Sequence, residues 1–253
     1  MTLKTRIIPT LLYKDFGLVK GERFDSRRAV GSAMQAIKVY NLRGVDELAF
    51  FDVTATRQGR EPDYELIDDL ADDCFMPLTV GGGVRTIDHV RRLLEVGADK
   101  VAFGTAAIES PELLTAAAER FGVQCVVAVV DTKPAVDGGP ERAWARSGTE
   151  ATELDPVELA VRLEAAGAGE ILLQSIERDG MMVGYDVDTI RAVADAVSIP
   201  VIASGGCGTY DHMVEALEAG ASALGAAAIY HFTEQTPMEA KHHLAAAGYP
   251  VRR

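Results

Sequence analysis

The sequence is poor in cysteine and histidine, and this scarcity argues against several classes of protein. Three cysteines, Cys74, Cys125 and Cys207, are spread over 253 residues without a CxxC pair. An odd number at such distances does not suggest a disulfide framework or a zinc site, and it is typical of reduced, mostly buried thiols. The five histidines are scattered along the chain as well. We therefore expect neither a bound metal ion nor a cofactor.

Long apolar runs and an excess of basic residues are also missing. No run approaches the roughly 18 apolar residues that a membrane span requires. The first twenty residues contain four basic side chains and no apolar core of the signal-peptide kind. The chain has 25 basic and 38 acidic residues, a net charge of -13, which argues against nucleic acid or an anionic membrane as a partner. We expect a soluble cytoplasmic protein that can still bind a small anion through backbone amides.

The sequence does contain an internal repeat. The segment 77–86 holds three successive glycines after a short apolar run, and a similar segment returns at 200–209. The same offset of 123 residues relates further identical pairs: Gly44 and Gly167, Glu47 and Glu170, Asp88 and Asp211, His89 and His212, and Gly97 and Gly220. Agreement without gaps is hard to obtain by chance. It predicts a single domain built from two similar halves, about 1–123 and 124–253.

Short apolar, β-branched runs alternate with helical patterns along the whole chain. The expected strands are 6–11, 47–53, 78–80, 100–103, 125–130, 170–174, 201–203 and 223–226. The expected helices are 29–43, 65–73, 87–96, 111–121, 156–166, 188–197, 211–219 and 237–247. Eight βα units predict a parallel sheet buried on both faces. With the two-fold repeat, this indicates an α/β fold, a (β/α)8 TIM barrel; an open doubly wound sheet is the alternative.

Two connections are long for a barrel, 13–28 after the first strand and 132–153 after the fifth. Both follow strands at the C-terminal face, where the active sites of barrel enzymes lie. Their symmetric placement suggests lids over a site, and the alternative is a pair of solvated insertions.

Glycine turns at two places in the repeat are candidate phosphate-binding sites. Glycine lets backbone N–H groups approach an anion, and the following helix N-terminus adds its dipole. In the first half the candidates are Gly82, Gly83, Gly104 and Thr105, and in the second half they are Asp179, Gly180, Gly205 and Gly206. Two such turns would suit a ligand with a phosphate at each end. The alternative is that the glycines only relieve crowding between strand and helix.

Carboxylates at strand ends are the candidate acid–base groups. Asp52, Asp131 and Asp179 each end or follow an apolar strand, where an acid faces the mouth of a barrel. Asp131 is the strongest candidate because it alone ends a run of six apolar residues. It could instead cap the following turn.

Charged residues at the opposite ends of the strands form a third group. Arg6, Glu47, Lys100 and Glu170 each lie at the start of a strand, and two acids and two bases pointing into one barrel floor could close a ring of ion pairs. Such a ring could be a structural plug or a gate.

Several segments together resemble the cyclase subunit of imidazole glycerol phosphate synthase. The matching segments are 6–9, 19–21, 46–48, 51–56, 59–61, 77–86, 97–100, 167–170, 178–180 and 199–206. The resemblance covers essentially the whole chain. It implies a (β/α)8 barrel that binds a phosphate at each end of its substrate. It also implies a glutaminase on the barrel floor that sends ammonia through the barrel, with Arg6, Glu47, Lys100 and Glu170 as the gate and Asp99 as a partner contact.

The sequence departs from this family at the mouth. The family has catalytic aspartates at the ends of strands one and five; Asp131 keeps the second, but Leu12 stands at the position of the first. Leucine cannot transfer a proton, so the usual ring closure is in doubt unless Asp52 or Asp15 substitutes. Three further ligand positions differ: Gly104 replaces an asparagine, Gln174 a threonine, and Ala228 a phosphate-binding serine.

The pair Leu11 and Leu12 and the segment 59–66 resemble a subgroup of cyclase-like paralogues. These act with a glutaminase and a third, ATP-dependent amidotransferase in placing nitrogen on sugars. The leading hypothesis is therefore a synthase subunit of a glutamine amidotransferase that delivers ammonia to a sugar or another anionic substrate. One alternative is an authentic cyclase subunit of histidine biosynthesis, a lyase. The other is a barrel without catalysis of its own that activates its glutaminase partner.

Overall fold

The computed structural model describes residues 4–15 and 17–252, and they form a closed barrel of parallel strands. The barrel strands are β1 (Arg6–Lys14), β4 (Leu48–Asp52), β5 (Leu78–Gly81), β6 (Lys100–Phe103), β7 (Val126–Pro134), β10 (Glu170–Ser175), β11 (Val201–Ser204) and β12 (Ala223–Ala226). Each pairs in parallel with the next, and β12 pairs with β1 to close the ring. The predicted (β/α)8 barrel is confirmed, and the open sheet is excluded.

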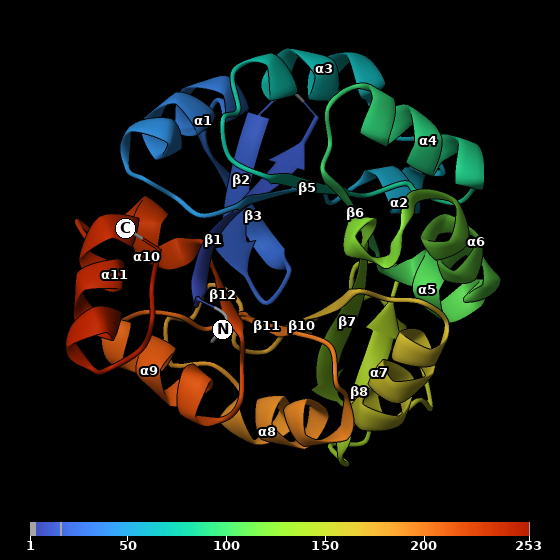
Figure 1. Ribbon diagram of the computed structural model, residues 1–253. Helices are drawn as coiled ribbons and strands as arrows, with labels where there is room; N and C mark the ends of the chain where they lie inside the picture. Colours follow the sequence, from blue (N-terminus) through green and yellow to red (C-terminus); the bar gives the residue numbers. More distant parts are fainter. Residues whose placement is uncertain (1–3, 16, 253) are drawn as a thin grey trace.

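Helices surround the barrel, as Figure 1 shows. The longer ones are α1 (Ala33–Leu42), α3 (Tyr64–Asp72), α4 (Ile87–Glu95), α6 (Glu112–Phe121), α7 (Pro156–Ala165), α8 (Val187–Ala196), α9 (Tyr210–Glu218) and α11 (Pro237–Ala246). Short pieces add α2 (Ala55–Gln58), α5 (Thr105–Glu109), the 3-10 turn η1 (Val123–Cys125) and α10 (Ala228–Phe232). These short helices have too few residues for a helical periodicity to show in the sequence. Among the described residues no helix is long and apolar enough to cross a membrane.

Equivalent positions of the repeat adopt the same local structure. Thr86 caps α4 by accepting a hydrogen bond from the His89 amide at 3.2 Å, and Thr209 caps α9 through the His212 amide at 3.3 Å. A threonine side chain at this position satisfies one of the free N–H groups of a helix start. The division of the chain into halves near residue 123 stays an interpretation of this repeat.

The hydrophobic core has two parts. The larger part lies between strands and helices. The smaller part consists of strand residues only, Ile8, Ala49, Ala102, Val127, Leu172, Ile202 and Ala223, each 3% exposed or less. Side chains of alternating strand residues fill the inside of a barrel in this way. The interior between the two ends of the barrel is therefore packed, with alanine at three of these positions.

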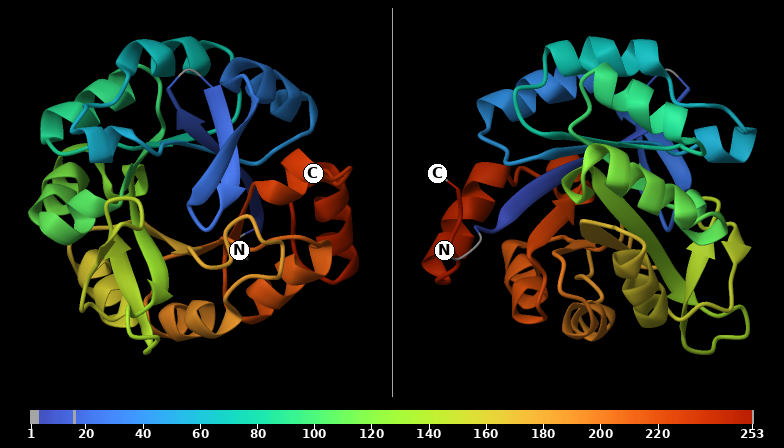
Figure 2. Two further views of the ribbon diagram at one scale, coloured as in Figure 1. Left: turned by 180° about the vertical axis from the view of Figure 1, so that it is seen from behind. Right: turned by 45° about the vertical axis from the view of Figure 1, so that its right-hand side comes forward.

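Both long connections contain strands, which the sequence analysis missed. β2 (Gly17–Glu22) and β3 (Asp25–Gly31) form an antiparallel hairpin on β1, and β8 (Glu141–Ala145) and β9 (Glu150–Ala151) extend β7. The expected helix start at residue 29 was consequently wrong, because residues 29–31 belong to β3. Residue 16 lies outside the described part of the chain. Figure 2 shows the hairpin of β2 and β3 lying across one end of the barrel.

The β2–β3 hairpin is fastened to the loop after β10. The backbone N–H of Arg23 donates to the carbonyl of Asp179 at 2.8 Å. Gly180 has a φ of +77°, and a Cβ there would collide with the carbonyl of Gly21. Only glycine permits this approach. The hairpin therefore forms part of the wall of the barrel mouth.

Candidate functional site

A cavity of about 500 Å³ opens at the carboxyl ends of the barrel strands. Active sites of TIM barrels lie at this end. The candidate phosphate-binding residues, Asp131 and Leu12 all line it: Leu12, Gly82, Gly83, Gly104, Thr105, Asp131, Asp179, Gly180, Gly205 and Gly206. The fold thus brings together residues that are far apart in the sequence.

The two glycine turns have equivalent geometry. Gly82 and Gly205 have φ of +109° and +87°, and a Cβ on either would collide with a backbone carbonyl, of Asp52 and of Ser175 respectively. A side chain at these positions is thus excluded by packing, whether or not an anion binds. The amide of Gly83 already donates to Thr56 Oγ1 at 3.2 Å, so this N–H reaches an anion only if it leaves the hydroxyl.

The start of a short helix lies beside each glycine turn. Gly104 precedes α5 and Ala227 precedes α10, at equivalent positions of the repeat. Thr105 Oγ1 accepts a hydrogen bond from the Arg146 amide at 2.9 Å, and its own proton remains available for a ligand. The equivalent Ala228 has no hydroxyl. At this position the first half therefore offers a hydroxyl donor that the second half lacks.

Asp131 is the carboxylate best placed for proton transfer. Burial raises the pKa of its carboxyl to about 7, and the negative charge of Asp179 adds to the effect. Among the described residues no hydrogen bond reaches this carboxylate, so nothing supports the capping role considered from the sequence. A carboxyl that titrates near neutral pH can both give and take a proton.

The other candidate carboxylates are engaged. Asp52 accepts from the amides of Thr54 and Ala55 and pairs with Arg60 at 3.1 Å, so it serves as a turn cap. Glu109 at the cavity pairs with Arg146 at 2.8 Å. Asp15 is exposed and does not line the cavity. Asp52 is held by these contacts and Asp15 lies outside the cavity, so neither replaces the acid that is absent at position 12.

Leu12 lies across the barrel from Asp131. It belongs to β1, which is four strands away from β7 in the ring of eight. Both residues line the cavity. The wall facing Asp131 is therefore apolar at this position.

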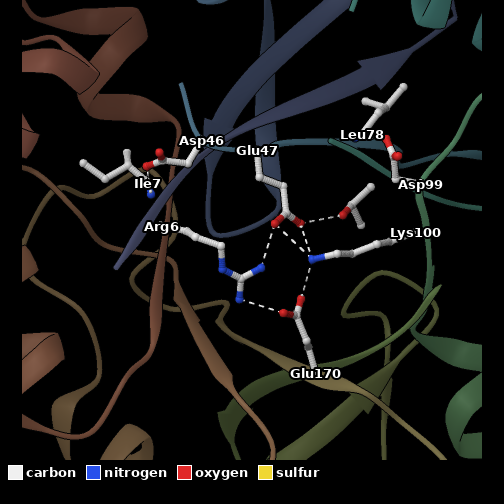
Figure 3. Close-up of polar contacts among 9 residues, drawn as sticks. Arg6, Ile7, Asp46, Glu47, Leu78, Asp99, Lys100 and Glu170 are labelled. Carbon is white, nitrogen blue, oxygen red and sulfur yellow. Dashed lines mark hydrogen bonds and ion pairs between the residues drawn. The ribbon is translucent and has the colours of Figure 1, made fainter. Parts of the chain in front are cut away.

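The four charged residues at the floor form a closed ring of ion pairs (Figure 3). Arg6 contacts Glu47 and Glu170 at 2.7 Å each, and the amino group of Lys100 contacts the same carboxylates at 3.0 and 2.9 Å. Thr79 Oγ1 also donates to Glu47 at 2.9 Å. Although burial opposes it, the carboxylates of Glu170 and Glu47 raise the pKa of Arg6 above its ordinary value. Each charge is thus matched by two opposite charges.

Two further aspartates fix strand starts at the floor. Asp99 is exposed, and its carboxylate accepts a hydrogen bond from the Leu78 amide at 2.8 Å. Asp46 is buried, accepts from the Ile7 amide at 3.0 Å and pairs with the buried Lys241 at 2.8 Å. Asp99 is therefore the member of this group that is open to a partner.

Comparison with known proteins agrees with this architecture. A family model described as "Histidine biosynthesis protein" matches residues 6–236. The chain is also 48% identical over 251 residues to proteins named "Imidazole glycerol phosphate synthase subunit HisF" from two strains of Caulobacter vibrioides, NA1000 / CB15N and ATCC 19089 / CIP 103742 / CB 15. Each alignment covers 99% of this chain and 96% of the relative. The chain belongs to the HisF family. The names of both relatives favour the histidine-pathway alternative over the sugar-amidation hypothesis.

One buried cation at the mouth of this HisF-family chain was not predicted from the sequence. Lys20 is 2% exposed, lines the cavity and contacts Asp179 Oδ1 at 2.6 Å. It lies on β2, in a segment that was expected to be a loop, although it falls within one of the matching motifs. Because the Asp179 carboxylate is paired with Lys20, it is not available as a general base.

Two arginines at the same mouth were also missed. Arg57 and Arg85 line the cavity close to the first glycine turn. Both are exposed side chains in segments without a regular apolar pattern, although Arg85 falls within the matching segment 77–86. Arg57 donates to the carbonyls of Arg146 and Ser147, at 3.4 and 3.1 Å, and Arg85 donates to the carbonyl of Gly59 at 2.8 Å.

Proposed function

We propose that the chain is the cyclase-type synthase subunit of an imidazole glycerol phosphate synthase. In this function it receives ammonia from a separate glutaminase at the barrel floor and uses it on a phosphorylated substrate at the mouth. The observation that carries the proposal is the 48% identity, over nearly the full length of both chains, to a protein with that name. It favours this function over the sugar-amidation hypothesis.

The mouth supports the chemical part of the proposal. A cavity of about 500 Å³ is large enough for a small-molecule substrate, and it has a glycine turn on each side. Asp131 would move the proton, because its pKa of about 7 leaves both protonation states populated at neutral pH. The glycine turns would hold the phosphates through backbone N–H groups.

The floor supports the partner. Three exposed apolar residues precede barrel strands on this face: Leu42 at 89%, Phe75 at 85% and Val123 at 53%. Large exposed apolar side chains around one face are typical of a protein interface. Asp99 lies at the start of β6 on the same face and offers a charge for orientation. A glutaminase seated here would release ammonia directly onto the ring of ion pairs.

Opening the ring would then admit ammonia. Lys100 is the residue of the ring that can move with the fewest changes. Its flexible side chain makes both of its contacts, to Glu47 and Glu170, through a single nitrogen, so one rotation would break both. A Lys100→Met variant should change the ratio of product formed to glutamine hydrolysed. Thr79→Val is the matched control, since it removes only the hydroxyl contact to Glu47. An unchanged ratio in Lys100→Met would contradict the gate and favour a purely structural role for the ring.

A second function is favoured by one observation, the apolar side chain of Leu12 facing the cavity. A barrel with a single acid at the mouth could deliver ammonia to a sugar or another anionic acceptor instead of closing an imidazole ring. In that function Asp131 would assist the acceptor, and the glutaminase partner would be kept.

One assay separates these functions. The chain is mixed with its glutaminase and the bisphosphorylated ribulosyl aminoimidazole carboxamide nucleotide, and imidazole glycerol phosphate is measured, with ammonium salt replacing glutamine in a parallel series. Turnover by the wild-type chain that is lost in Asp131→Asn is the result expected for the cyclase subunit.

The variants at position 12 sharpen the result. No turnover in the wild type, together with activity in Leu12→Asp but not in Leu12→Asn, would favour the second function. Leu12→Asn is the control because it introduces a polar group that does not ionise. A barrel that only activates its partner predicts that Asp131→Asn changes no product of the complete complex.

A further inference from the structure

Two hydroxyl groups line the deep end of the cavity. Ser204, Gly225 and Thr10 lie on the neighbouring strands β11, β12 and β1, and all three line the cavity. Each stands two residues after a residue of the inner core on its own strand, in order Ile202, Ala223 and Ile8. Residues two apart on a strand point to the same face. At these three positions, therefore, the packed interior of the barrel ends and the cavity begins.

The hydroxyl of Thr10 is buried without a partner. Thr10 is 7% exposed, and among the described residues none forms a hydrogen bond with its Oγ1. A buried hydroxyl without a hydrogen bond is destabilising and rare. Val129 precedes Asp131 by two residues just as Thr10 precedes Leu12, so valine, which has no hydroxyl, stands at the equivalent place on β7. Packing of the barrel therefore does not require a hydroxyl at position 10, and its presence points to a partner that enters through the cavity.

The second hydroxyl, of Ser204, has free space beside it. A Cβ on Gly225 would lie only 2.9 Å from Ser204 Oγ. Because glycine has no side chain, room for a small molecule remains beside this hydroxyl, on the side of the strand that separates it from Thr10. At the offset of 123 residues that relates the halves, Gly81 corresponds to Ser204. The second hydroxyl is therefore also confined to one side of the cavity.

The inner core beneath these residues can pass a small neutral molecule but not an ion. It consists of apolar side chains, and three of its seven residues are alanine. A charge in an apolar layer is strongly destabilised. In the proposed function ammonia must therefore cross this layer as neutral NH3, which has one lone pair and three N–H groups. A hydroxyl can both donate and accept a hydrogen bond, so it can bind either part of this molecule.

We infer that Thr10 and Ser204 form a docking point for neutral ammonia at the bottom of the cavity. The Thr10 hydroxyl donates to the lone pair of the nitrogen, and Ser204 Oγ accepts one of its N–H groups. Ammonia held here waits below the substrate instead of escaping through the open mouth. Thr10 is thus a positioning residue for the nucleophile. The docking point rests on the proposed function, because it supposes that ammonia crosses the barrel.

The first test needs no substrate and no glutaminase. Urea unfolding of the full chain is measured at alkaline pH, where neutral ammonia is present, in equal concentrations of ammonium chloride or potassium chloride. A molecule that binds only the folded state raises its stability. The variants are Thr10→Val, which removes the hydroxyl, and Thr10→Ser, which keeps it. Thr132→Val is the matched control, since Thr132 is 1% exposed on a barrel strand but does not line the cavity.

The urea midpoint of the wild type is expected to be higher in ammonium chloride than in potassium chloride. Thr10→Ser and Thr132→Val should keep this shift, Thr10→Val should lose it, and at acidic pH it should vanish in every variant. No ammonium-specific shift in the wild type, a shift that survives in Thr10→Val, or a shift that persists at acidic pH would each overturn the docking point.

The second test uses the complete complex. Thr10→Val should form less imidazole glycerol phosphate per glutamine hydrolysed than the wild type. With ammonium salt in place of glutamine, its KM for ammonium should rise about fivefold, as expected for the loss of one neutral hydrogen bond. The kcat at saturating ammonium and the KM for the nucleotide should stay unchanged. A fall in kcat with an unchanged KM for ammonium would show a merely structural role for Thr10 and overturn the docking point.

The two tests separate the docking point from the proposed function. Normal product formation without an ammonium-specific shift would leave the cyclase function intact and refute only the docking point. A shift that depends on the Thr10 hydroxyl, without any imidazole glycerol phosphate, would retain the docking point and refute the cyclase function.

Discussion

Replacing Asp131 by asparagine should stabilise the protein at alkaline pH while impairing its function. The carboxyl has a pKa of about 7 in the folded chain, raised first by burial and then by the charge of Asp179. In the unfolded chain an aspartate titrates near 3.9. The folded state therefore holds a proton that the unfolded state has lost, over the range from about pH 4 to about pH 7.

The sign of the effect follows from this difference. Between these pH values the folded protein binds more protons, so its stability falls as the pH rises and levels off above the folded pKa. The two pKa values lie about three pH units apart, and each unit corresponds to about 1.4 kcal/mol. The free energy of unfolding should therefore fall by up to about 4 kcal/mol as the pH rises through this range. Because the cavity is open to water, which reduces the cost of burying the charge, we expect a fall in the free energy of unfolding of about 2 kcal/mol.

Asparagine has the size of the protonated acid and carries no charge. Relative to the wild type, Asp131→Asn should therefore gain about 2 kcal/mol near pH 8 and almost nothing near pH 4. Urea unfolding at a series of pH values measures the difference, and Asp137→Asn, an exposed position on the same hairpin, is the control. A gain that does not depend on pH, or a loss of stability near pH 8, would refute the raised pKa and with it the acid–base role.

Three further substitutions test the packing around the site. Gly180→Ala should cost at least about 2 kcal/mol more than Gly138→Ala in urea unfolding, because both have a φ of +77° but only the first would place a Cβ against backbone. Equal costs would contradict the tight approach of the β2–β3 hairpin. Lys241→Met should cost about 3 to 5 kcal/mol, since it leaves the buried Asp46 without its cation, and adding Asp46→Asn should restore part of this stability. Thr209→Ala should lower stability by about 1 kcal/mol through loss of the helix cap, and no change would refute the capping contact.

The barrel could be predicted from the sequence because its signals are local. Each βα unit has its own apolar run and helix pattern, and all eight expected strands recur in the structure with small shifts at their ends. The first hairpin was missed because β2 pairs with β1 and β3 pairs with β2, without a helix between them. Short antiparallel strands with polar residues have no pattern that distinguishes them from a loop.

The members of the floor ring could also be chosen from the sequence, since all four stand at the start of a strand or just before it. In a parallel barrel those positions share one end, so charged residues there must meet. What they do for ammonia is a proposal, because the ion pairs alone are compatible with a plug.

The sequence by itself determined the closed barrel, the end at which the cavity opens and the residues that end its strands there, because these follow from the order and period of its elements. Only the tertiary structure decided which charges are free. Among the described residues, no hydrogen bond or ion pair reaches the Asp131 carboxylate, while Asp179 is bound to Lys20, 159 residues away in sequence. Arg57 and Arg85 likewise have no carboxylate partner in this part of the chain, while Arg146 is paired with Glu109. A charge is neutralised or left available by side chains that approach from distant segments, and no local pattern records that approach.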